Sequence, residues 1–118
     1  GGPRMTKDFP QIADQLGQAI GELGKGIPEA MQAFASLARA AKADGALDAK
    51  TKELIAVAIA IALRCDGCIA FHVKEVLKLG GSRDELLETI AMAVMMGGGP
   101  STVYGAEALT AYDQYADG

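Results

Sequence analysis

Glycine and proline residues divide this chain into segments of helical length. Between these breakers, no segment alternates apolar and polar residues as a half-buried β-strand would. Aromatic residues make up only 5% of the chain and tryptophan is absent, whereas strands are enriched in aromatic and β-branched residues. The pattern therefore predicts an all-α protein whose helices are each about three to five turns long.

Six helices are expected from the apolar spacing and the breakers. The expected segments are 10–23, 28–41, 49–64, 66–79, 83–96 and 101–115. Asp48 is a suitable N-cap for the third helix, and Ser82 with Glu85 has the pattern of a capping box for the fifth. Gly80 is expected to end the fourth helix in a left-handed conformation, and residues 24–26 to end the first.

The length of 118 residues predicts a single domain. Residues 5–118 are assigned to it, while Gly-Gly-Pro-Arg at 1–4 is expected to be the remainder of an expression tag and is excluded. Half of the chain is apolar, which is enough for a buried core at this size.

The net charge of −4 and the absence of Lys or Arg runs argue against a nucleic-acid partner. Two cysteines are too few for a disulfide-rich secreted scaffold, and no secretory signal pattern is visible, so a soluble cytoplasmic protein is expected. Residues 54–63 are all apolar, but a membrane span needs about 20 such residues. The segment is instead expected to be a helix buried on most sides.

Residues able to carry chemistry gather in Cys65-Asp66-Gly67-Cys68-Ile69-Ala70-Phe71-His72. At about 100° per helical residue, Cys65, Cys68 and His72 fall on one face, within about 60° of each other. The two cysteines are close enough to form a disulfide, and a helix N-terminus favours a thiolate. His72 lies one turn beyond Cys68 and could exchange a proton with it directly or through one water.

Glu53 precedes Cys65 by twelve residues, which is about 18 Å on one straight helix. If the chain reverses near residues 63–67, Glu53 instead lies beside His72. The carboxylate could then orient the imidazole, and the imidazole could draw the proton from Cys68.

Plainer interpretations of these residues stay open. The cysteines could be inert buried thiols, or they could bind zinc with His72 and a fourth ligand. Glu53 could be a surface residue that complements a helix dipole.

The order Glu53, eleven residues, Cys-X-X-Cys, three residues, His72 resembles the alkylhydroperoxidase D-like group of the carboxymuconolactone decarboxylase family. The resemblance is close over residues 53–72 and looser over the rest of the chain. It implies a peroxide-reducing dithiol in a small all-helical subunit that forms a homo-oligomer, often a trimer or hexamer. Gly67 stands where the founding members carry a second histidine.

Site roles follow from the same resemblance. Cys68 is implied to attack the peroxide, Cys65 to resolve the product as a disulfide, and Glu53 and His72 to relay the proton. The partners implied are a hydroperoxide substrate and an external dithiol reductant; we expect no cofactor and no metal. The alternatives are a non-redox decarboxylase-like enzyme that uses His72 and Glu53 on a lactone acid, and a zinc-holding binding protein.

Uncovered apolar surface independently predicts a homo-oligomer. Residues 54–63 and 91–96 are apolar nearly all round, so one small subunit would leave parts of them exposed. Met92, Met95 and Met96 are accordingly expected in the core or at a subunit interface.

Overall fold

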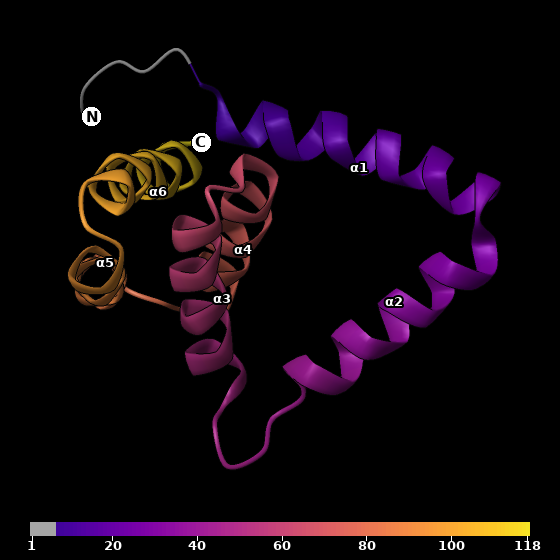
Figure 1. Cartoon of the computed structure of the whole chain (residues 1–118), viewed down its shortest axis with the longest axis horizontal. Coiled ribbons are helices and arrows are strands. Elements are labelled where there is room, and N and C mark those ends of the chain that lie inside the picture. The colour runs from indigo at the N-terminus through magenta and orange to yellow at the C-terminus, as the bar shows by residue number, and fades with distance from the viewer. Residues whose placement is uncertain (1–6) are drawn as a thin grey trace.

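The computed structural model describes residues 7–118, and within them the chain consists of six α-helices and no strands (Figure 1). The expectation for residues 1–4 lies outside this described part. The helices are α1 (Phe9–Gly26), α2 (Pro28–Lys42), α3 (Ala49–Leu63), α4 (Asp66–Lys78), α5 (Arg83–Gly97) and α6 (Gly99–Asp117). The all-α prediction is therefore confirmed.

Helices α3 to α6 pack against one another and form the bundle that contains the core (Figure 1). The first turn of α1 completes this core with Phe9. The largest fully buried side chains are Phe9, Val57, Ile61, Ile69, Val73, Val76 and Leu86. Burial of an apolar side chain of this kind stabilises the fold by about 1.5–3 kcal/mol, so the bundle holds most of the hydrophobic stabilisation.

The remainder of α1 and all of α2 extend away from the bundle, and we call residues 17–42 the arm. Figure 1 shows α1 leading outward and α2 returning toward the start of α3. No residue of the arm is buried, and α2 makes few contacts with α3. The arm is therefore helical without having a hydrophobic core of its own.

Local signals place most helix ends correctly. The Asp48 side chain accepts the Thr51 N–H, and Ser82 and Glu85 form a reciprocal capping box. Gly80 has a φ of 80°, a conformation that costs glycine little, and it ends α4 as expected.

Two boundaries differ from the expected ones. Helix α1 continues through residues 24–26, because glycine inside a helix costs only about 1 kcal/mol and does not by itself end it. The helix ends at Ile27, whose position before Pro28 disfavours helical geometry. Helix α6 begins at Gly99 rather than at residue 101, because Gly98 alone makes the break and Pro100 fits the first turn.

The expectation that residues 54–63 are buried on most sides is wrong. Val57 and Ile61 are fully buried, but Ile55, Ile59 and Leu63 are between 44% and 72% exposed. These three residues recur every fourth position and form a stripe on the side of α3 that the bundle does not cover. Met92, Met95 and Met96 are also exposed in the single chain, so they are not part of its core.

Among the described residues, no helix combines the length and the hydropathy needed to cross a bilayer.

Candidate active site

The chain reverses sharply between α3 and α4, at the place that the sequence predicts. Arg64 adopts a left-handed conformation with φ 57°, and its N–H bonds back to the carbonyls at the end of α3. The Cys65 N–H donates to the Ala60 carbonyl at 3.0 Å. These contacts fold α4 back along α3 and set the positions of all four predicted site residues.

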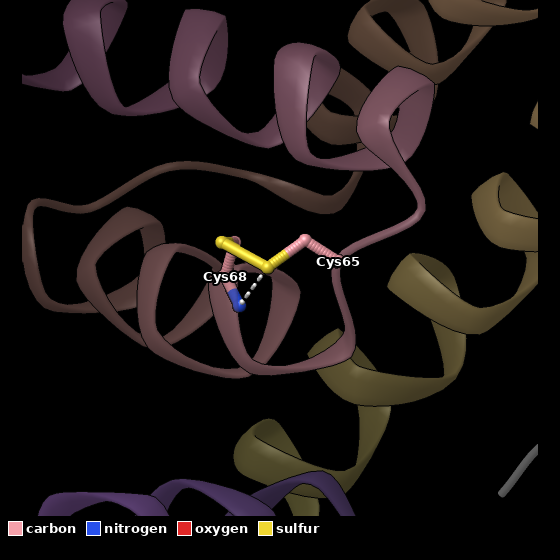
Figure 2. The surroundings of a disulfide bond; sticks show 2 residues. All are labelled: Cys65 and Cys68. Carbon is pink, nitrogen blue, oxygen red and sulfur yellow. Dashed lines mark hydrogen bonds between the residues drawn. A yellow bond between two sulfur atoms is a disulfide. The ribbon is translucent and has the colours of Figure 1, made fainter. Parts of the chain in front are cut away.

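The two cysteines form a disulfide at the start of α4 (Figure 2). Cys65 lies just before the helix, as its N-cap, and Cys68 lies in its first turn. The Cys65 sulfur accepts the backbone N–H of Cys68 at 3.2 Å. Cys65 thus takes the place that a Ser or Asp side chain takes in other helices, and the amide that it accepts would also stabilise a thiolate.

Glu53 and His72 meet across the hairpin, as expected. The Glu53 Oε2 atom lies 2.7 Å from the His72 Nδ1 atom, and Glu53 is only 4% exposed. When the ring is neutral and Nδ1–H donates to this carboxylate, Nε2 carries the lone pair that can accept a proton. No hydrogen bond from the described chain occupies Nε2.

The proximity of His72 to Cys68 follows from their spacing of four residues on α4. Residues four apart on a helix have Cβ atoms about 5–6 Å from each other. In the disulfide form, no hydrogen bond joins the two side chains within residues 7–118. The structure thus brings the carboxylate and the imidazole together and leaves the sulfur one turn away.

Lys42 is a further site residue that sequence reasoning missed. Its Nζ lies 3.7 Å from Oε1 of Glu53, the oxygen that His72 does not use. Lys52 donates to the carbonyls of Ala41 and Ala43, at 2.9 and 2.6 Å, and so ties the end of α2 to α3. The only sequence signal was a basic residue near the end of the expected helix 28–41, which usually just complements the helix dipole.

A groove of about 750 Å³ separates the arm from α3 and α4. Glu53, Lys42 and His72 contribute to its wall, and most of the remaining wall is apolar. The larger apolar side chains that line it are Phe34, Leu37, Ile55, Ile59 and Phe71. The volume is in the range of small-molecule sites, but neither cysteine lines this groove.

Away from the groove, Lys7 forms ion pairs that fix the loop carrying the two cysteines. Its ammonium group binds both oxygens of Glu107 at 2.8 and 2.9 Å and Asp66 at 3.1 Å. The hydrogen bond to Glu107 is the main cause that raises the pKa of Lys7 above its usual value. Asp66 follows Cys65 directly, so Lys7 joins the dithiol loop to α6.

Gly67, between the cysteines, lies under α1. A Cβ atom at this position would be 2.5 Å from Cδ1 of Leu16, closer than carbon atoms pack. A histidine here, as in the founding members of the resembled group, would require the Leu16 side chain to move.

The zinc alternative gains no support from this arrangement. Within residues 7–118, no group of three or more His, Cys, Asp or Glu side chains is placed to hold a metal ion. The two candidate sulfur ligands are instead bonded to each other.

Comparison with known proteins places this geometry in a family. The chain matches the carboxymuconolactone decarboxylase family along residues 28–111. It is 40% identical to an uncharacterized protein of Cupriavidus necator over 92% of its own length and 96% of the relative. It is 36% identical to an uncharacterized protein encoded in the cox locus of Paracoccus denitrificans, over 81% of this chain and 86% of that one.

Comparison with solved structures points to the same family. A carboxymuconolactone decarboxylase family protein from Legionella pneumophila is 52% identical, with a TM-score of 0.90 over 92% of this chain and 96% of that one. A Thermotoga maritima member, described as a candidate for the antioxidative response, is 27% identical, with a TM-score of 0.77 over 87% of this chain and 91% of that one. The alkylhydroperoxidase D-like resemblance is consistent with these matches. The chain belongs to the carboxymuconolactone decarboxylase family.

Proposed function

We propose that the protein is a dithiol peroxidase, or disulfide oxidoreductase, that reduces hydroperoxides. The observation that carries the proposal is a Cys65–Cys68 disulfide at a helix N-terminus, with the Glu53–His72 pair one turn beyond it. The description of the Thermotoga maritima relative as a candidate for the antioxidative response supports the same chemistry.

In the first step, His72 Nε2 takes the proton of Cys68, and the resulting thiolate attacks one oxygen of the hydroperoxide. The O–O bond breaks, and an S–O bond forms. The departing alkoxide takes the proton from His72 and leaves as an alcohol, while Cys68 becomes a sulfenic acid. Glu53 holds the imidazole in the tautomer that this transfer needs.

In the second step, Cys65 gives up its thiol proton and its thiolate attacks the sulfur of the Cys68 sulfenic acid. The S–S bond forms, the S–O bond breaks, and the departing hydroxide takes up the released proton and leaves as water. The Cys68 N–H already points at the Cys65 sulfur at 3.2 Å, a contact that favours the thiolate required here. The two sulfurs are therefore activated by different groups, Cys68 by an imidazole and Cys65 by a backbone amide.

An external dithiol must then reduce the disulfide by thiol–disulfide exchange and become a disulfide itself. We propose that this happens in the cytoplasm, where the pool of reduced thiols can supply such a partner.

Counting free thiols tests the proposal. Reduced protein treated with a slight excess of cumene hydroperoxide should lose both thiols together. Cys68→Ser should abolish peroxide consumption, whereas Cys65→Ser should still consume one equivalent and leave a sulfenic acid that dimedone traps. Peroxide consumption that survives Cys68→Ser would overturn the assigned roles.

A non-redox enzyme of the decarboxylase type is the second candidate. It is favoured by one observation: Glu53 and His72 line the groove, and the cysteines do not. Such an enzyme would use His72 and Glu53 on a lactone acid. Turnover of carboxymuconolactone by the Cys65→Ser, Cys68→Ser double variant would favour this candidate over the peroxidase.

We also propose that the protein works as a homo-oligomer, with a trimer or hexamer as the expected state. The support is the exposed apolar surface of the arm and of α3: Phe34 is 63% exposed and Leu37 is 64% exposed. A contiguous apolar surface of this kind usually marks an interface. Size-exclusion chromatography with light scattering tests this, because a stable monomer at micromolar concentration would contradict it.

A further inference from the structure

The Glu53 carboxylate has partners on two different helices. His72 of α4 contacts Oε2 at 2.7 Å, and Lys42 of α2 lies 3.7 Å from Oε1. The Glu53 side chain is only 5% exposed. A buried carboxylate that loses its counter-ion is strongly destabilised, so Glu53 needs a cation beside it throughout any reaction.

His72 cannot be that cation at every stage. In the relay under Proposed function, on which this inference rests, the imidazole must be neutral before it takes the thiol proton. At that moment Lys42 is the counter-ion of Glu53. We infer that Lys42 is a positioning residue that keeps His72 neutral, and therefore able to act as a base, at the working pH.

Among the described residues, no cation besides Lys42 and His72 lies within ion-pair distance of Glu53. Without Lys42, the carboxylate would therefore pair with the imidazolium itself. The ring would then bind its proton more readily, because an opposite charge nearby favours the charged form and the repulsion from Lys42 would be gone. A ring that is already protonated has no lone pair left for the thiol proton.

The arm delivers Lys42 to this position through the Lys52 contacts. Lys52 binds the carbonyls of Ala41 and Ala43, the residues on either side of Lys42. Carbonyls at the end of a helix lack partners within it, so Lys52 satisfies them and fixes the end of α2. Lys42 is thereby held beside Glu53 although its own side chain is 49% exposed and no residue of the arm is buried.

Other charges near His72 do not take this role. The remaining titratable groups that line the groove are Lys52 on α3, and Lys74 and Glu75 on α4. Helix α1, which also packs on α4, contributes none to the groove, and from α6 the Tyr115 hydroxyl donates to the Ala70 carbonyl. Among the described residues, Lys42 is the lysine within ion-pair distance of Glu53.

The experiment uses the fact that His72 is the only histidine in the chain. Its ring protons can therefore be followed by NMR in the reduced protein as the pH is changed. In Lys42→Gln, the pH of half protonation should rise by about half a unit or more. Lys42→Arg should restore it, and Lys74→Gln, which removes a charge from the same groove without touching Glu53, should leave it unchanged.

The rate of thiol oxidation by peroxide, measured across a range of pH, gives a second test. The acidic limb of the pH dependence of thiol oxidation should move up by the same amount in Lys42→Gln, while the rate at high pH stays near that of the parent protein. Circular dichroism confirms that each variant is folded.

An unchanged or lowered half-protonation pH in Lys42→Gln would overturn the inference. An equal shift in Lys74→Gln would also overturn it, because the effect would then be general loss of positive charge. If the ring shifts as expected but His72→Asn still oxidises at the parent rate, the relay fails and Lys42 remains the counter-ion of Glu53. If His72→Asn is slow and the ring does not shift, the relay stands without Lys42.

Discussion

The bundle and the arm have opposite sources of order. In the bundle, α3 to α6 bury seven large side chains almost completely together with the start of α1, whereas no residue of the arm is buried. Isolated helices of this length are marginal in water. The fold of the bundle is therefore stabilised by its own core, whereas the position of the arm depends on a few polar contacts and on whatever covers its apolar face.

The candidate site lies where these two regions meet. The disulfide and Glu53 belong to the bundle, His72 lines the groove between bundle and arm, and Lys42 comes from the arm. The four candidate site residues thus belong to the bundle, and the arm adds the charge of Lys42 at its edge.

A core truncation should give the largest effect. Ile61→Ala removes a fully buried side chain from α3 and should lower the free energy of unfolding by about 2–5 kcal/mol. Urea denaturation followed by circular dichroism measures this. The exposed Ile59→Ala on the same helix is the matched control, and an equal loss there would show that α3 has no distinct buried side in solution.

Changing the arm should alter assembly more than the fold of the subunit. Phe34→Ser removes the most exposed aromatic side chain of the groove and should shift the proposed oligomer toward smaller species at equal concentration. Light scattering across a dilution series measures it, with the exposed Gln32→Ser as control. If the parent protein melts at a temperature that does not depend on its concentration, the arm is not held by a second copy.

A capping change within the bundle should have a smaller effect. Ser82→Ala removes half of the capping box of α5 and should cost about 1 kcal/mol of stability. Ser36→Ala, at an exposed position of the arm, should change the midpoint of thermal unfolding by much less. Equal shifts in the two variants would contradict the contrast between bundle and arm.

What the sequence predicted and what it missed differ in how far apart the interacting residues lie along the chain. The caps at Asp48 and Ser82 and the reversal that brings Glu53 to His72 depend on neighbours in sequence or on a short hairpin, so local reasoning found them. Lys7 and Glu107 pair across a separation of 100 residues, which no local pattern shows. The sequence predicted that part of residues 54–63 would be left uncovered in one subunit, but not which part, because a continuous apolar run does not reveal which side of the helix faces outward.

The smallest effect concerns acid stability. Hydrogen bonds from Arg83 lower the pKa of Asp113, and the hydrogen bond from Lys50 is the main cause that lowers the pKa of Glu85. A carboxyl whose pKa is lower in the folded state stabilises the protein above its unfolded pKa, and this stabilisation is lost as the pH falls through the folded value.

Both ion pairs join helices of the bundle and are partly exposed, so each contributes little to stability. Asp113→Asn should therefore reduce stability slightly at pH 7 and flatten its decline below about pH 4, as urea denaturation at several pH values would measure. Asp44→Asn, on the exposed connection after the arm, should leave most of that decline in place; an equal flattening there would mean that acid acts on the whole chain rather than on the bundle.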